Sequence, residues 1–324
     1  MDMLLPKYKK IILRNSCDRY GISHFFAEQL RLPFVPRSFA NWQHGWIWID
    51  KLTPDKLFDV KTTRKSQSII VCNVSEKKVL ESAEYSNVTV GGLPFAYIPK
   101  QNVQPIPGAL VAFLTHSSEG GKINNSSKYL YFDYLESIRK DFSKIFICIY
   151  WLDYNENIAY EIKRRGLVPL SGARPDDKYS LLRIRTILEY CPYVTSNMIG
   201  SHLLYALYAG CIVSLTEPLY DIRADMQKQL ENYCDNEIDY ILYGQDIDYI
   251  KANFSWLLVN HPLAGIKNVD YAKKNIGEEW MLSIEKIKEV LGWKMVDQLY
   301  GYGSGLIRRC MRKFNCTLNL KAIL

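Results

Sequence analysis

The segment at 191–218 holds the densest group of side chains that could bind an anion. The candidate residues are Ser196, Asn197, Gly200, Ser201 and His202. They follow a short apolar strand and open a helix, whose free backbone N–H groups and positive dipole end attract negative charge. Hydroxyl, amide and imidazole groups add further donors. The pattern predicts a phosphate-binding site at this helix start; ordinary capping of the helix by Ser or Asn is the alternative.

A histidine lies in an aromatic turn near the N-terminus. His44 stands beside Gly45, among Trp42, Trp46 and Trp48, in the run NWQHGWIWID. A histidine in such a turn is either a general base with a pKa near neutrality or a core residue with satisfied hydrogen bonds. The sequence leaves both interpretations open, and we carry His44 forward as a candidate catalytic base.

A third candidate is the loop THSSEGGK at 115–122, which follows an apolar strand. Its small residues, hydroxyls and Lys122 are typical of a loop that cradles an anion, and His116 in the same loop is a candidate catalytic residue. The spacing matches no P-loop, so hydrolysis of a nucleoside triphosphate is not supported. A flexible surface loop is the alternative.

Metal binding is not predicted. Asp246 and Asp248 form a DxD motif, but they precede a helix-like stretch instead of following a strand, so helix capping is the preferred interpretation. The eight cysteines are scattered singly, without CxxC pairs and without a histidine at zinc-finger spacing. We therefore expect neither a metal framework nor a disulfide framework.

The elements that must position these residues are most regular from about residue 109 to 218. Short apolar runs alternate with amphipathic stretches, as in a parallel sheet covered by helices on both faces. Strands are expected at 108–115, 144–152, 167–172, 193–196 and 211–218, and helices at 128–142, 155–165, 176–190 and 200–209. Gly166 and Gly210 stand where two of these helices should end.

The rest of the chain is less regular. Strands are expected near 10–13, 68–74 and 87–92, with helices near 23–30, 76–84, 219–234, 246–258 and 268–291. A Pro-rich stretch at 99–108 has the composition of an exposed linker. We predict an α/β protein with a smaller N-terminal α/β domain at 1–104, a doubly wound, Rossmann-like C-terminal domain at 105–235, and a helical C-terminal region with a basic tail at 236–324.

The amino-acid composition limits which kinds of binding partner the protein can have. The 324 residues carry 41 Lys and Arg against 34 Asp and Glu, and 48% are hydrophobic, which indicates a folded protein and excludes a dedicated nucleic-acid binder. No signal peptide and no long apolar run is present, so we expect a cytoplasmic protein. The basic, amphipathic segment 306–314 either binds an anionic membrane surface peripherally or packs back on the protein.

Four segments together resemble a known family. WQHGW, VGGLPFAYI before the Pro-rich stretch, THSS, and TSNMIGSHLLYALYAGCIVSL look like bacterial surface-polysaccharide glycosyltransferases of the GT-B type, among them sialyltransferase-like and Kdo-transferase-like enzymes. The resemblance implies two Rossmann-like domains facing each other across a cleft. It also implies a nucleotide-sugar donor as substrate without a cofactor or metal, and a capsule, O-antigen or lipopolysaccharide acceptor, free or lipid-linked.

The same resemblance assigns roles to the candidate residues. Ser196, Asn197, Gly200, Ser201 and His202 become contacts of the donor phosphates or nucleotide. His116 becomes their partner and His44 the base on the acceptor side. Tyr205 stands where many such enzymes carry a ribose-binding glutamate, which leaves cytidine-linked donors open. A polysaccharide pyruvyl transferase and a non-catalytic glycan-assembly protein are the alternatives.

Overall fold

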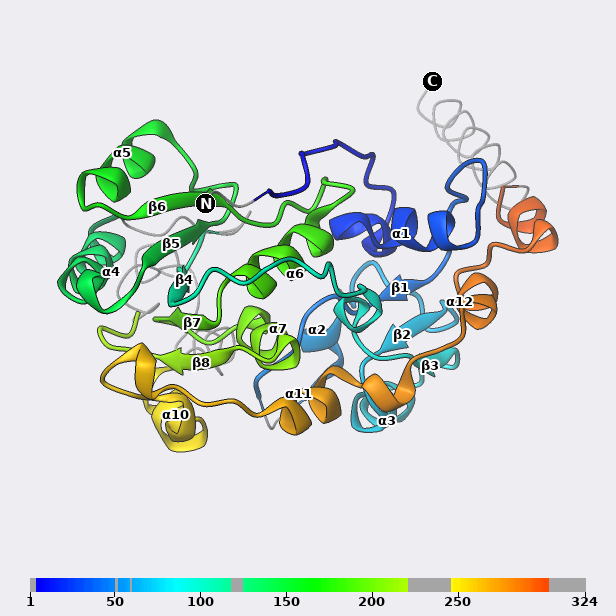
Figure 1. The fold of residues 1–324 in the computed structure, drawn as a ribbon. Helices are drawn as coiled ribbons and strands as arrows, with labels where there is room; N and C mark the ends of the chain where they lie inside the picture. The colour runs from blue at the N-terminus through cyan, green and yellow to red at the C-terminus, as the bar shows by residue number, and fades with distance from the viewer. Residues whose placement is uncertain (1–3, 50–51, 59, 118–124, 221–245, 303–324) are drawn as a thin grey trace, which may run out of the picture.

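The structure, a computed structural model, describes residues 4–49, 52–58, 60–117, 125–220 and 246–302 (Figure 1). These residues form two parallel sheets, one of five strands and one of three, which lie in different halves of the chain. Helices cover the sheets, and a mainly helical segment follows the larger one in sequence. The predicted α/β class, with two parallel sheets and a helical C-terminal region, is confirmed.

The larger sheet has the strand order β6-β5-β4-β7-β8, with every neighbouring pair parallel. Its strands are β4 (Ala109–Phe113), β5 (Lys144–Ile149), β6 (Val168–Ser171), β7 (Tyr193–Ser196) and β8 (Ile212–Leu215). Its helices are α4 (Asn125–Ser137), α5 (Glu156–Arg164), α6 (Ser180–Tyr190) and α7 (Ser201–Ala209), with a 3-10 turn, η3 (Arg139–Asp141), after α4. Because Gly166 and Gly210 have positive φ angles of 71° and 89°, the helix ends predicted there are confirmed.

Alternate residues of β4 show how the helices are distributed. Leu110 and Ala112 pack with α4 and α5 in one buried cluster, whereas Val111 and Phe113 pack with α6 and α7 in another. The five-stranded sheet is therefore covered on both faces, which is the arrangement of a doubly wound domain.

The smaller sheet has the order β1-β2-β3, again parallel. Its strands are β1 (Asn41–Trp42), β2 (Ile69–Val71) and β3 (Val88–Val90). The helical elements of this half are η1 (Ser16–Gly21), α1 (Ile22–Gln29), α2 (Pro54–Leu57), α3 (Val74–Ser82) and η2 (Pro94–Tyr97). A capping box starts α3, because Asn73 accepts from the Glu76 backbone N–H and the Glu76 carboxylate accepts from the Asn73 backbone N–H.

The C-terminal helical region returns to the smaller sheet. It contains α10 (Ile247–Asn253), η4 (Ser255–Leu257), η5 (Pro262–Ala264), α11 (Val269–Ile276), η6 (Glu278–Trp280) and α12 (Ile284–Val290). The backbone N–H of Leu93 donates to Ile276 O at 2.9 Å, and Trp293 Nε1 donates to Ser38 Oγ at 3.1 Å. The N-terminal segment contacts the half of the chain that holds the larger sheet, since Tyr20 N donates to Pro175 O, which follows β6. One buried cluster consequently joins both sheets.

Two predicted elements are wrong. The strand expected at 10–13 is reduced to a single bridge between Lys10 and Asp177, because this segment lies against a loop and not against a sheet edge. The helix expected at 268–291 is interrupted because Gly277, with a φ of 76°, ends α11 in the left-handed conformation. The helix near 219–234 falls largely outside the described residues, and so does the basic segment 306–314.

Candidate functional site

The central feature of the larger sheet is the point where its winding reverses. Strands β4 and β7 are neighbours, but the chain leaves β4 toward β5 and leaves β7 toward β8 on the opposite side. The two loops diverge there, so ligands of doubly wound proteins bind at the carboxyl ends of such strands. The loop after β4 carries His116, and the loop after β7 leads to His202 at the start of α7.

Ser196 and Asn197 tie these two strand ends together. Ser196 is fully buried, and its Oγ lies 2.8 Å from Phe113 O; Asn197 Oδ1 accepts from Thr115 N at 3.3 Å. Both side chains are thus engaged within the protein and set the spacing of the strand ends. Their predicted direct contact with a phosphate stays a prediction.

The start of α7 lacks a side-chain cap. Gly200 is the N-cap residue, and no side chain within the described residues accepts from the first turn as a cap. The capping alternative is therefore not observed here. Ser201 Oγ instead accepts a hydrogen bond from Trp46 N at 2.9 Å, which attaches the aromatic turn at 43–46 to this helix.

His202 lies folded back over the helix start. Its ring stacks on Phe113 with 5.0 Å between centroids, and a Cβ on Gly200 would lie only 2.8 Å from it. Its Nε2 atom is buried without a hydrogen-bond partner among the described residues. Burial, with a smaller contribution from His116, lowers the pKa of His202 to about 3, so this imidazole is neutral at pH 7.

His116 is exposed at the same edge of the sheet. Its ring stacks on Tyr150, which follows β5, at 4.2 Å, and Nδ1 lies 2.9 Å from the carbonyl oxygen of Ser117. Phe113, three residues before His116, stacks on the His202 ring, so both imidazoles lie at the same edge of the sheet. The structure therefore brings together two residues that are 86 positions apart in the sequence.

A buried ion pair holds the beginning of this loop. Asp153 Oδ1 lies 2.8 Å from Lys128 Nζ, and both side chains are buried. The same carboxylate accepts from the backbone N–H and the hydroxyl of Ser117. Burial alone would raise the pKa of Asp153, but the hydrogen bonds from Lys128 and Ser117 outweigh it and keep the pKa below its usual value. The sequence analysis missed this pair, because Lys128 is indistinguishable from a surface lysine by type.

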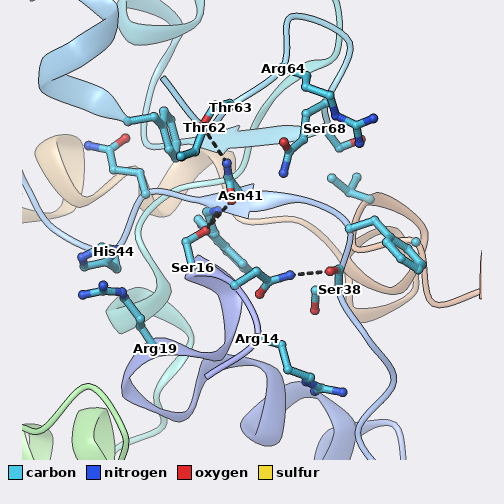
Figure 2. Close-up of a pocket in the computed structure, with 18 of the residues that line it drawn as sticks. Arg14, Ser16, Arg19, Ser38, Asn41, His44, Thr62, Thr63, Arg64 and Ser68 are labelled. Carbon is cyan, nitrogen blue, oxygen red and sulfur yellow. Dashed lines mark hydrogen bonds between the residues drawn. The ribbon is translucent and has the colours of Figure 1, made fainter. Parts of the chain in front are cut away.

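Figure 2 shows His44 beside Arg19. Burial, followed by the positive charge of Arg19, lowers the pKa of His44 to about 4. Its Nδ1 atom is buried and lacks a partner among the described residues. The pKa of His44 therefore lies below the near-neutral range, and one of its ring nitrogens is unsatisfied; its role as catalytic base stays a prediction. Burial is the main cause of the lowered pKa, and the smaller contribution comes from a cation that lies 25 positions away in sequence.

The turn that carries His44 is fixed from both halves of the chain. Gln43 accepts from Cys72 N and donates to Gly45 O, both at 3.0 Å. From the other side, Tyr205 Oη donates to His44 O at 2.8 Å. Tyr205, which departs from the expected ribose-binding glutamate, therefore acts on this turn and stacks on Phe95.

A cavity of about 1680 Å³ lies on the other side of the same turn, along the edge strand β1 (Figure 2). Its described lining comes from 13–68 and 289–302, with no residue of the five-stranded sheet. His44, Gly45 and Trp46 line this cavity while Trp46 also contacts the start of α7. One turn of chain therefore separates the cavity from the switch point.

Aromatic residues beyond β5 and β6 were missed by the sequence analysis. Trp151 directly follows Tyr150, and its Nε1 atom is buried without a partner among the described residues. The guanidinium carbon of Arg174, after β6, lies 4.8 Å from the Trp151 ring centroid. Trp151 lies at the end of one predicted strand and Arg174 just after another, so strand ends were the signal that could have found them.

The described part of the chain contains neither a metal-binding cluster of side chains nor a helix that could span a membrane. No group of three or more His, Cys, Asp or Glu side chains is arranged there to hold a metal ion. The Asp246 carboxylate accepts from Tyr249 N and caps α10, as predicted for the DxD motif. Among the same residues, no helix has the length and apolar character needed to span a membrane.

No protein-family model and no curated protein matches the chain. Among solved structures it is similar to TarM, with 15% identity, 77% of this chain and 48% of that chain covered, and a TM-score of 0.34. An S. aureus TarM variant in complex with Fondaparinux, alpha-GlcNAc-glycerol and UDP gives 15% identity, 78% and 49% coverage, and a TM-score of 0.36.

The pneumococcal O-GlcNAc transferase GtfA, in complex with UDP and GlcNAc, gives 12% identity, 78% and 51% coverage, and a TM-score of 0.33. The chain thus spans about half the length of these solved structures. TM-scores of this size do not establish a shared fold, and the likeness carries no functional conclusion.

Proposed function

We propose that this chain is a glycosyltransferase that moves a sugar from a nucleotide-sugar donor to a glycan acceptor. The observation that carries the proposal is the arrangement around the 43–46 turn. An uncapped helix start with two neighbouring imidazoles lies on one side of it, and a large polar cavity lies on the other. Transfer between two substrates requires two such sites in close proximity.

The donor side would be the switch point. Departure of the nucleotide leaves negative charge on its phosphates, and donors aimed at that charge lower the barrier. The backbone N–H groups at the start of α7 and the unpartnered Nε2 of His202 are suited to this role, with His116 as a second imidazole. Tyr150 and Trp151 at the same edge offer flat surfaces for a nucleobase.

The acceptor side would be the cavity along β1. His44 lines it, and its neutral imidazole has a free acceptor at Nδ1 if Nε2 carries the proton. It could therefore take the proton of an acceptor hydroxyl in an inverting transfer. We further propose, from the sequence resemblance, that the acceptor is a lipopolysaccharide, O-antigen or capsule glycan, that no metal is needed, and that the acceptor is met at the membrane surface.

A thermal-shift screen tests the proposal. The chain is heated with CMP, CDP, UDP, GDP or phosphoenolpyruvate in turn; a ligand at one hundred times its Kd adds about 2.7 kcal/mol of stability. We expect stabilisation by one class of nucleotide, which also identifies the donor class. A shift with phosphoenolpyruvate alone would indicate a pyruvyl transferase. A nucleotide shift without turnover of any nucleotide sugar would indicate a non-catalytic glycan-assembly protein.

A further inference from the structure

The cavity along β1 has a surplus of positive charge. Its described lining includes Arg14, Arg19, Arg37, Lys56 and Arg64 against Asp55, Glu289 and Asp297. Arg14 is paired with the buried Asp18 outside the lining, and Glu289 is paired with lysines on its own segment. Among the described residues, Arg19, Arg37 and Arg64 form no ion pair. These three guanidinium groups are available to an anionic ligand.

Arg19 is held in place by its backbone. The next residue, Tyr20, has a φ of 59°, and Gly21 has a φ of 81°. A Cβ on Gly21 would lie 1.9 Å from Lys178 O, and Tyr20 N donates to Pro175 O at 2.7 Å. A non-glycine residue with positive φ costs free energy and persists only where the surroundings enforce it. The strained turn is thus clamped against the other half of the chain, which orients Arg19 in advance.

Arg19 and His44 lie side by side in Figure 2. Arg19 has no acidic partner among the described residues, and the Nδ1 atom of His44 has no hydrogen-bond partner there. An arginine that lines a cavity without an ion-pair partner is available for charge-assisted hydrogen bonds to an anionic ligand. Figure 2 places Arg64 on the opposite side of the cavity, beside Ser68, so positive charge lines more than one part of the cavity.

The other residues that line the cavity have side chains of the kinds that bind sugars. Tyr300 and Tyr302 are exposed at the wall, and Tyr302 packs edge-on against Phe39. Their rings can lie against the apolar faces of sugar rings. The Asn41 and Thr63 side chains, which form a hydrogen bond of 3.0 Å with each other, provide polar groups for the hydroxyls of a sugar. A volume of about 1680 Å³ exceeds the roughly 300–1,000 Å³ of ordinary small-molecule sites, so it accommodates several sugars.

We infer that the cavity binds an acidic glycan, with one anionic group at Arg19 and others along the chain near Arg64. Carboxylate-bearing and phosphate-bearing glycans share the chemistry that guanidinium groups recognise. The inference depends on the proposed function only where it identifies this glycan as the acceptor of the transfer. The binding itself needs no donor and is tested without one.

Isothermal titration of the full chain tests the inference with three probes. They are a galacturonic-acid hexamer, the same hexamer with its carboxyl groups reduced to alcohols, and a hexose oligomer linked by phosphodiesters. We expect an acidic probe to bind at least about tenfold more tightly than the reduced hexamer, with affinity falling as salt rises. The tighter of the two acidic probes then identifies the anionic group.

Variants locate the binding. Arg19→Gln and Arg64→Gln each remove one charge and are expected to weaken the acidic probe about ten- to a hundredfold, as for lost charge-assisted hydrogen bonds. Arg139→Gln, an exposed arginine on η3 outside the cavity lining, is the matched control and should bind as the parent does. Unchanged melting temperatures of the ligand-free variants verify that they fold.

Equal binding of the acidic and reduced hexamers, or full affinity in both cavity variants, would overturn the inference. If no glycan binds while a nucleotide still stabilises the chain, the inference fails and the proposed function stands. If the acidic probe binds through Arg19 but no nucleotide has any effect, the proposed function fails and the glycan site stands.

Discussion

His44 and His202 are both imidazoles whose pKa burial lowers, and each has a ring nitrogen without a partner among the described residues. A neutral imidazole carries one donor and one acceptor, so each ring can serve either purpose toward a ligand. The two differ in position. His202 lies at the helix start of the larger sheet, and His44 lines the cavity of the smaller one.

The His202 ring is expected to contribute directly to transfer. His202→Asn should lower kcat by roughly 10² to 10³, the usual effect of removing one donor from a developing negative charge. Ser201→Ala should also lower turnover, because it removes the acceptor of Trp46 N and loosens the turn. Single-turnover assays with the donor identified by thermal shift provide the measurement. Parent activity in both variants would exclude the phosphate site.

His44→Asn separates acceptor chemistry from donor binding. If His44 accepts the proton of the acceptor, this variant should lose most transfer and keep its nucleotide-induced thermal shift, because the base belongs to the acceptor side. The measurement pairs the transfer rate with the shift. A joint loss of nucleotide binding and melting temperature would instead make His44 a packing residue.

The lowered pKa values predict how stability depends on pH. Between about pH 4 and 6.5 the unfolded chain binds protons at His44 and His202 that the folded chain does not, so the unfolding free energy rises with pH. The contribution is complete above pH 6.5 and is lost as pH falls. Each histidine accounts for at most about 1.4 kcal/mol per pH unit. Urea unfolding of His44→Asn and His202→Asn should show shallower pH slopes; slopes equal to the parent's would contradict this.

At the scale of elements, the turn between η1 and α1 determines where Arg19 lies. Gly21 combines a positive φ with close contact to another segment. Gly210 also has a positive φ, but a Cβ added there would have no heavy atom of the described residues within 4 Å. Substitutions at these two glycines therefore separate the free-energy cost of the left-handed backbone conformation from the cost of a steric clash.

Gly21→Ala should destabilise the protein more than Gly210→Ala. The left-handed conformation alone costs about 1–2 kcal/mol for a residue with a Cβ, which is the expectation for Gly210→Ala. In Gly21→Ala the new Cβ must also displace Lys178 O, since the two would lie 1.9 Å apart. Denaturant unfolding compares the two variants with the parent. Equal losses would show that the turn is not clamped against the 175–178 segment.

At the scale of the whole molecule, the chain crosses twice between the two halves. Residues at 7–20 reach the loops beyond β6, and α11 and α12 return to the smaller sheet (Figure 1). The largest buried cluster includes Trp42 and Ile70 from one sheet and Val111 and Val194 from the other. The halves thus share a core, although each has its own sheet.

Unfolding should therefore be one cooperative transition. Shared buried contacts couple the stabilities of the two sheets, so neither half should melt first. Calorimetry should give one peak whose calorimetric and van't Hoff enthalpies agree, with tryptophan fluorescence and far-ultraviolet circular dichroism following the same curve. Two separated transitions would show that the sheets fold independently.

The amino-acid sequence by itself determined the larger sheet and the elements around it. Strand and helix periodicities alternate there, and Gly166 and Gly210 end helices as expected, because side-chain periodicity and positive φ are local properties. The same local logic identified the polar residues at the ends of β4 and β7. It failed at 10–13, where an apolar run has no neighbouring strand.

Only the tertiary structure decided how the candidate residues act. The sequence cannot show that Trp46 donates to Ser201, that Arg19 lies beside His44, or that residues of the 289–302 segment line the cavity. Burial and electrostatic effects depend on distance in space, and these partners are far apart along the chain. The residue types were therefore visible in the sequence, whereas their pKa values, hydrogen-bond partners and shared cavity arise from the fold.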